Sequence, residues 1–244
     1  MARSSIIPIL VPEIEIDIFS NKSALILFWL LANHNQVKNE GFSINELSRE
    51  AEVSIGLVHK VIKQLEYKGI IISKGFRTNK RFYLKLANKL IVDWVKEYNL
   101  LKKTKIKGFY LPTSDKINLK KLRLIPALHS AASELYHLKV TNLRVKEFYL
   151  SDWKNLSQVI NKLELQELDR GYEFILIKPY YSILVERVLD IENNTIWKKA
   201  YNILVFLDLC HFPLRGLEQA EVLFRNSNLL TSICQWSEIE NVLG

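Results

Sequence analysis

Hydrophobic and polar positions between residues 42 and 86 change from helical to strand-like spacing. Apolar residues recur at helical spacing in residues 44–51 and again in residues 55–68. The apolar stripe of the second segment consists of Val58, Val61, Ile62 and Leu65. Residues 70–72 and 82–86 are short apolar runs of strand length, separated by a basic segment that contains glycine and asparagine. The pattern predicts two helices followed by a two-stranded hairpin with a basic tip.

Local signals mark the ends of these elements. Ser43 and Glu46 have the S-x-x-E spacing of a capping box at a helix start. Ser54 is placed to cap the second helix, and Gly69 is placed to end it in a left-handed conformation. The turn between such helices commonly carries glycine, so Glu52 is expected at positive φ, at a cost of about 1 kcal/mol. Together these features predict a winged helix-turn-helix, whose second helix enters a DNA major groove.

Residues on either side of this segment are expected to support it. Alternating acidic and apolar residues at 13–19 predict a short edge strand with an acidic, solvated face. Residues 22–32 are apolar nearly all round and predict a buried helix, which the polar loop 33–41 is expected to end. Residues 87–98 predict an amphipathic helix, and the lysine-rich residues 101–110 are expected to form a solvated linker or a further phosphate contact.

The pattern changes after residue 110. The continuous apolar run at 174–177 predicts a buried strand, and residues 183–189 fit either a strand or a helix. Further elements are expected as a strand at 142–150, a turn at 190–194, and helices at 127–138, 154–163, 196–209, 217–225 and 229–242. The predicted fold class is α+β. Its expected parts are an N-terminal winged helix-turn-helix domain at 1–86, a connecting helix and basic linker at 87–110, and a compact α/β domain with a small sheet at 111–244.

Charge is distributed unevenly along the 244 residues, whose formal net charge is +8. Residues 1–85 contain 12 Lys/Arg and 8 Asp/Glu, net +4, and residues 86–123 contain 10 and 3, net +7. Residues 124–244 contain 12 and 15, net −3. Residues 53–85 hold eight basic residues and one acid, Glu66. The first half is therefore expected to attract a polyanion such as double-stranded DNA.

The second predicted helix and the hairpin supply the candidate DNA contacts. The outer face of the helix would reach base edges and backbone in the major groove, and the basic tip would contact the flanking minor groove or phosphates. The candidate DNA-binding residues are Ser54, Ile55, Gly56, His59, Lys60, Lys63, Lys74, Arg77, Asn79, Lys80 and Arg81. We predict no catalytic, cofactor-binding or metal-binding residues.

The sequence contains none of the common enzyme motifs: no phosphate-binding GxxxxGK[ST] loop, no GxGxxG, no HExxH and no GxSxG. Cys210 and His211 are adjacent, but neighbouring positions rarely bind one metal, and a buried thiol beside a surface imidazole is favoured. The two cysteines lack CxxC spacing, which favours a reducing compartment. The dense apolar run 24–32 is shorter than the roughly 20 residues of a membrane span. We expect a cytoplasmic protein that is not an enzyme and makes no membrane contact.

The second half of the chain resembles a known family. The segment DLCHFPLRGLEQAEVLF at 208–224, with IKPYY at 177–181, is similar to the C-terminal domain of the AbiE-type antitoxin family. In that family a winged helix is followed by a helix similar to LANKLIVDWVKEY at 86–98, and then by an α/β antitoxin domain. The resemblance covers about residues 40–225, although its winged-helix part is common to many bacterial regulators.

The resemblance implies a repressor of its own operon, whose second domain opposes the nucleotidyltransferase-like toxin of a type IV toxin–antitoxin system. The toxin's active site would then belong to the partner. No catalytic role is carried over to Asp208, Arg215 or Glu221, which are interpreted as an internal ion-pair set at the start of helix 217–225. The chain departs from the family in its missing turn glycine and its apolar extension 1–19. Many winged-helix repressors are homodimers, but no heptad pattern predicts a dimer here.

Two other functions stay open at this stage. A winged helix can dock an acidic protein surface, which would make the chain an interaction adaptor. A DNA-acting nuclease could hold a divalent ion with Asp169, Glu173 and Lys178 around the strand at 174–177. The nuclease signal is weak, because charged residues commonly flank strands.

Overall fold

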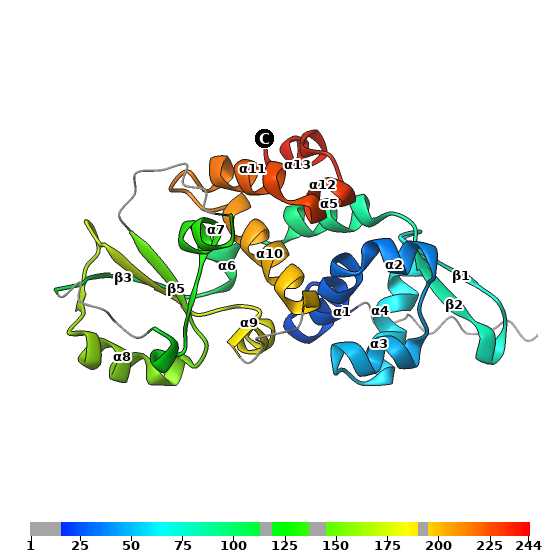
Figure 1. The fold of residues 1–244 in the computed structure, drawn as a ribbon, viewed down its shortest axis with the longest axis horizontal. Helices are drawn as coiled ribbons and strands as arrows, with labels where there is room; N and C mark the ends of the chain where they lie inside the picture. Colours follow the sequence, from blue (N-terminus) through cyan, green and yellow to red (C-terminus); the bar gives the residue numbers. More distant parts are fainter. Residues whose placement is uncertain (1–15, 113–118, 137–144, 190–194) are drawn as a thin grey trace, which may run out of the picture.

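The chain forms an elongated molecule, with a five-stranded sheet at one end, a two-stranded hairpin at the other, and helices between them (Figure 1). The structure is a computed structural model and describes residues 16–112, 119–136, 145–189 and 195–244. Helices and strands are mixed throughout these residues, which agrees with the predicted α+β class.

Within the described residues, four helices precede the hairpin: α1 (Asn21–Ala32), α2 (His34–Asn39), α3 (Ile44–Ala51) and α4 (Ile55–Tyr67). Every residue of α1 from Ser23 onward is buried, as its all-round apolar sequence predicts. The capping box of α3 is present, with Ser43 Oγ accepting from Glu46 N at 3.1 Å and the Glu46 carboxylate accepting from Ser43 N at 3.3 Å. Gly69 lies two residues after the end of α4 and has φ +69°, the left-handed conformation predicted for it.

Strands β1 (Ile71–Lys74) and β2 (Arg81–Leu84) form the antiparallel hairpin, with Lys74 opposite Arg81. Phe42 adds a bridge on the other side of β2: its N–H donates to Phe82 O at 2.9 Å, and Phe82 N–H donates to Phe42 O at 2.8 Å. The hairpin is thereby attached to the residues that lead into α3. Helix α5 (Ala87–Glu97) follows and, as the predicted amphipathic helix should, buries one side, which consists of Leu90, Ile91, Trp94 and Val95.

The five-stranded sheet has the order β4-β5-β7-β3-β6, and within it only β5 and β7 run parallel. Its strands are β3 (Ile106–Tyr110), β4 (Leu124–Pro126), β5 (Lys146–Leu150), β6 (Gln166–Glu167) and β7 (Phe174–Ile177). In β7, Phe174 and Leu176 pack with α8 (Leu156–Leu163) on one face. Ile175 and Ile177 join the main core on the other. Burial on both faces explains why β7 is apolar at every position.

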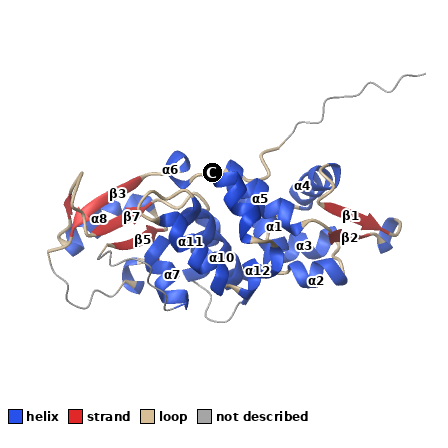
Figure 2. Ribbon diagram, turned by 90° about the horizontal axis from the view of Figure 1, so that it is seen from above, coloured by secondary structure: helices blue, strands red, loops and turns tan. Residues whose placement is uncertain are grey.

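Helix α10 (Thr195–Cys210) is the central helix, and it packs against α1, α7 (Leu128–Tyr136), α9 (Ser182–Leu189) and α11 (Gly216–Asn226). Figure 2 shows it between the sheet and the N-terminal helices. Most of the buried apolar residues form one cluster that runs from α1 to one face of the sheet, and a smaller second cluster lies between the other face and α8. The division at residue 86 into functional domains stays a prediction.

Several predictions about secondary structure are wrong. The expected loop 33–41 contains α2, and the expected helix 229–242 is two helices, α12 (Asn228–Ile233) and α13 (Trp236–Leu243). The expected linker 101–110 contains α6 (Leu100–Lys103) and β3. Strand β3 pairs with β7 on one side and β6 on the other, so Lys107 belongs to the sheet, where it forms an ion pair with Glu167 of β6.

The structure decides between the two alternatives for residues 183–189, which are helical and lie within α9. Of the expected strand 13–19, residues 13–15 lie outside the described residues, and the remainder forms a turn in which Ser20 N–H donates to Asp17 O at 3.2 Å. The expected turn 190–194 also lies outside them.

Candidate nucleic-acid interface

A groove of about 680 Å³ lies between α3, α4 and the tip of the β1–β2 hairpin. Five of the predicted DNA-binding residues line it: His59, Lys60, Lys63, Arg77 and Lys80. The first three come from α4 and the other two from the hairpin, so the fold brings together basic side chains that are distant in sequence. The groove is also lined by residues that are not among the predicted DNA contacts: Ser43, Ile44 and Asn45 around the start of α3, and Ile62, Glu66 and Phe82.

The remaining predicted DNA-binding residues of α4 are exposed at its start. Ser54 caps the helix by accepting from Leu57 N at 3.3 Å, and Ile55 is 50% exposed although it is apolar. Gly56 is also exposed. The opposite face of α4 carries the buried stripe that the sequence predicts. One face of α4 is thus used for packing, and the other is exposed to solvent.

The turn between α3 and α4 is held by hydrogen bonds within it. Ser48 Oγ donates to Val53 O at 2.6 Å, and Val53 N–H donates to Ser48 O at 3.1 Å. Glu52 has φ 53° and ψ 45°, the left-handed conformation predicted for it. These contacts fix the orientation of α4 relative to α3.

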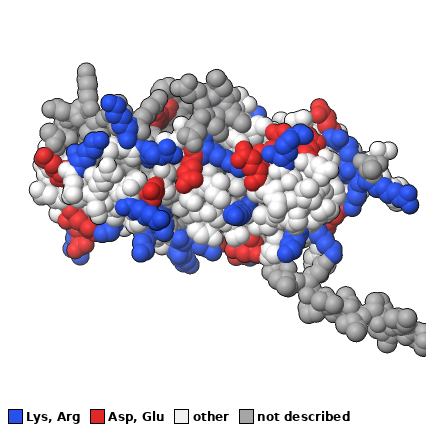
Figure 3. Space-filling view, turned by 90° about the horizontal axis from the view of Figure 1, so that it is seen from below, with Lys and Arg blue, Asp and Glu red and all other residues white. Residues whose placement is uncertain are grey.

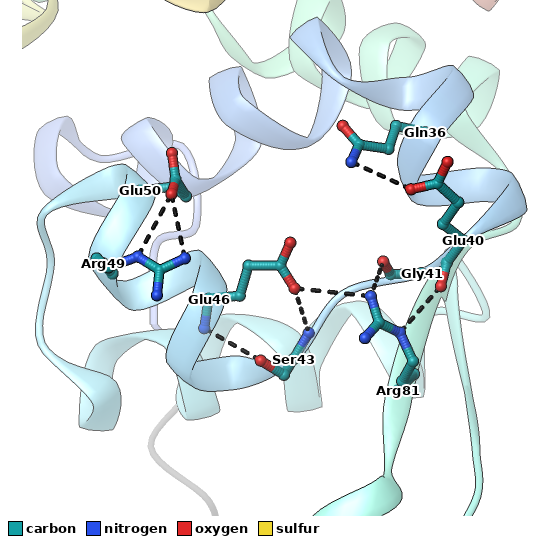
Figure 4. Close-up of polar contacts among 8 residues, drawn as sticks. All are labelled: Gln36, Glu40, Gly41, Ser43, Glu46, Arg49, Glu50 and Arg81. Carbon is teal, nitrogen blue, oxygen red and sulfur yellow. Dashed lines mark hydrogen bonds and ion pairs between the residues drawn. The ribbon is translucent and has the colours of Figure 1, made fainter.

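Arg81 has a structural role that its position in the basic tip does not reveal (Figure 4). Its Nε donates to Glu40 O at 2.9 Å, and its Nη2 donates to Gly41 O at 2.7 Å. The same Nη2 lies 3.7 Å from the Glu46 carboxylate of the capping box. Arg81 therefore ties the hairpin to the residues before α3, whatever further contact its exposed part makes.

The other basic residues of the hairpin are placed over aromatic rings or exposed. Lys74 Nζ lies 5.2 Å from the Tyr83 ring centroid, and Lys80 Nζ lies 4.7 Å from that of Phe82. Lys80 Nζ is also 3.9 Å from the carboxylate of Glu66, the single acid in this part of the chain. Arg77 and Asn79 are exposed at the tip. Lys and Arg side chains gather at this end of the molecule (Figure 3).

A buried polar cluster lies in the other half of the molecule. Tyr98 Oη donates to Asp208 Oδ1 at 2.6 Å, and Tyr149 donates to Asp208 Oδ2. Burial raises the pKa of Asp208 to about 7, although the two hydrogen bonds oppose the shift. The predicted ion-pair set of Asp208, Arg215 and Glu221 is therefore wrong. Arg215 pairs with Glu218 and Arg225 with Glu221.

Two further hypotheses about this half of the chain concern the adjacent Cys210 and His211 and the nuclease residues around β7. Cys210 is buried, as expected, but His211 is half-buried and lies within hydrogen-bonding distance of Val95 O, at 2.7 Å from its Nε2. Glu173 precedes β7 and Lys178 follows it, so the length of a strand, roughly 16 Å, separates them. In the described ranges, no three His, Cys, Asp or Glu residues are grouped as metal ligands would be. The described residues therefore give the nuclease hypothesis no support.

None of the described helices combines the length and the apolar character required to cross a membrane.

A known family matches the chain. The family model described as transcriptional regulator, AbiEi antitoxin, type IV TA system matches residues 84–228. No curated protein and no solved structure matches. The match begins at the last residue of β2 and covers the whole five-stranded sheet, so it is narrower than the resemblance over 40–225 and leaves out α3 and α4. Because it covers more than half of the chain, this protein belongs to the family of AbiEi antitoxin transcriptional regulators of type IV toxin–antitoxin systems.

Proposed function

We propose that the chain is a sequence-specific DNA-binding repressor of its own operon, in which α3 and α4 act as a helix-turn-helix and the β1–β2 hairpin as a wing. Helices α1, α3 and α4, with the short α2 between the first two, are followed by an antiparallel hairpin, and three helices before a hairpin are the order of elements in that class of domain. Membership in a family of transcriptional regulators supports the regulatory role.

The observation that carries the proposal is the groove shared by α4 and the hairpin tip. Its walls hold Lys60 and Lys63 on one side and Arg77 and Lys80 on the other. Phosphates bound along these walls would release counterions, which is the main source of affinity in protein–DNA binding. The exposed start of α4, with Ser54, Ile55 and Gly56, is the part of a recognition helix that reaches base edges.

The test is operator binding by a Lys60→Ala plus Lys63→Ala variant. We expect its affinity for the DNA upstream of its gene to fall by about 10- to 100-fold. The slope of log K against log salt should decrease in magnitude by about 2, because two phosphate contacts are lost.

A matched control is Lys154→Ala plus Lys162→Ala, which removes the same charge from two exposed lysines at the sheet end of the molecule. This control should bind as the wild type does. Equal losses in the two double variants would mean that only net charge matters, and unchanged binding in the first would show that α4 is not the recognition helix.

We also propose that the chain opposes a cognate toxin, and that this toxin is nucleotidyltransferase-like. The family match supports an antitoxin role for residues 84–228. Co-expression of the chain with a candidate toxin encoded beside it should restore growth that the toxin alone arrests. If the Lys60→Ala plus Lys63→Ala variant also restores growth, the two activities are separable.

A further inference from the structure

Phe76, at the tip of the β1–β2 hairpin, is 89% exposed. Its side chain belongs to neither hydrophobic cluster of the described residues. A bulky aromatic ring placed in water contributes nothing to the stability of the fold, and its loss should leave the hairpin intact. The ring is therefore accessible to another molecule.

The backbone holds this ring outward in a defined position. Gly75 has φ +83°, and a Cβ there would lie 2.5 Å from Asn79 O, so only glycine fits the turn. Asn79 N–H donates to Phe76 O at 3.1 Å, and Lys80 N–H donates to Arg77 O at 3.2 Å. A tip closed in this way loses little conformational entropy when it inserts into a ligand.

The surroundings of Phe76 favour a polyanion as that ligand. The sequence contains no Asp or Glu between residues 67 and 92, whereas Lys74, Arg77 and Lys80 lie within four positions of the ring. Arg77 and Lys80 also line the groove that α4 shares with the tip. A duplex bound to α4 would thus pass directly beside Phe76, which favours DNA over a membrane or a protein surface.

We infer that Phe76 is an apolar wedge, inserted from the minor groove between two base pairs beside the segment that α4 contacts. This inference rests on the proposed DNA binding. Apolar side chains inserted in this way unstack one base step and bend the duplex by roughly 20–90° toward the major groove. Pyrimidine–purine steps deform most easily, so a TA or CA step is expected at the contacted position. Phe76 would then contribute specificity without hydrogen bonds to bases.

The experiment uses the full chain, the shortest upstream duplex that it protects from nuclease digestion, and 2-aminopurine substituted at each candidate step in turn. For the wild type we expect increased 2-aminopurine fluorescence at one step, and a bend in circular-permutation electrophoresis. Phe76→Ala should lose both signals and bind roughly tenfold more weakly. Phe76→Leu, which keeps an apolar wedge, should retain most of the bend.

The control variant is Tyr110→Ala, which removes a 42% exposed ring from the sheet at the other end of the molecule and should change nothing. If Phe76→Ala binds and bends DNA as the wild type does, the wedge is wrong and the proposed repressor function stands. If the wild type binds no upstream DNA at any salt concentration, both are wrong. Circular dichroism and urea unfolding of each variant exclude loss of the fold as the cause.

Discussion

Arg187 of α9 binds the end of α3 and the residue that makes the turn into α4. Its Nη2 donates to Ala51 O at 2.9 Å and to the Glu52 carboxylate at 3.1 Å. Its guanidinium carbon lies 4.3 Å from the ring centroid of Trp197, and only 12% of its side chain is exposed. Arg187 lies in the segment that matches the antitoxin family, and Ala51 lies outside it. The contact therefore joins the family-defining part of the molecule to the candidate DNA interface.

Replacing Arg187 with Ala should lower the free energy of unfolding by about 1–3 kcal/mol, because the Ala51 carbonyl loses a charged donor and Trp197 loses its stacking partner. It should also weaken operator binding, because the α3–α4 turn is less firmly held. Urea unfolding and a binding titration measure the two effects. Arg187→Lys keeps the charge but not the planar fork, and should be nearly as damaging. Unchanged operator binding by a destabilised Arg187→Ala protein would show that the turn does not depend on this contact.

Glu52→Gly should stabilise the protein by about 0.5–1 kcal/mol. Glu52 has φ 53°, where a side chain is strained and glycine is not. The variant loses the ion pair with Arg187, but the Glu52 side chain is 73% exposed, and Arg187, which is 12% exposed, keeps its hydrogen bond to the Ala51 carbonyl. Glu52→Ala separates the two effects in thermal or urea unfolding, since it removes the carboxylate and keeps the strain. It should give no gain, and a gain equal to that of the glycine variant would contradict the explanation from backbone strain.

Arg81→Ala and Arg77→Ala should differ in stability although each removes one charge from the hairpin. Arg81 donates to the carbonyl oxygens of Glu40 and Gly41, and its loss should lower the free energy of unfolding by about 1–2 kcal/mol. Arg77 is exposed at the tip, and its loss should change stability by less than about 0.5 kcal/mol. Urea unfolding of both variants makes the comparison. Equal stabilities would show that the Arg81 contacts contribute nothing.

What the sequence predicts well are features that depend on neighbours in the chain. The capping box of Ser43 and Glu46, the left-handed Glu52, and the buried stripe of α4 all involve residues a few positions apart. The basic residues of the groove could also be expected, because the exposed face of α4 and the basic hairpin tip follow from local sequence patterns.

Contacts between residues that lie far apart in the sequence could not be predicted from local patterns. Arg81 binds carbonyl groups forty residues away, and Arg187 binds one 136 residues away. Strands β4 and β6 have three and two residues, too few for a periodic pattern, and they form only because longer strands pair with them. Asp208 did leave a signal: it is the one acid in the apolar sequence of α10, four residues after the buried Leu204. That spacing places a carboxyl group on the buried side of the helix.

The buried Asp208 makes the stability of the protein dependent on pH. Its pKa is about 7 in the folded chain, against roughly 3.9 in an unfolded one, so the folded state binds its proton more tightly. Stability from this group is fully present below about pH 4 and is lost as the pH rises toward and through 7. The loss approaches about 1.4 kcal/mol per pH unit between these values.

Asp208→Asn removes the titration and keeps the shape of the side chain, so its own pH profile should be flatter over this range. Urea unfolding of both proteins at pH 5, 6, 7 and 8 measures the difference. The variant should gain stability relative to the wild type as the pH rises, because the wild type alone must then bury a carboxylate. Tyr98→Phe removes a hydrogen bond to the carboxylate and should therefore raise the pKa of Asp208. The loss of stability in this variant should extend to higher pH than in the wild type. Parallel profiles for the wild type and Asp208→Asn would show that Asp208 does not titrate between pH 5 and 8.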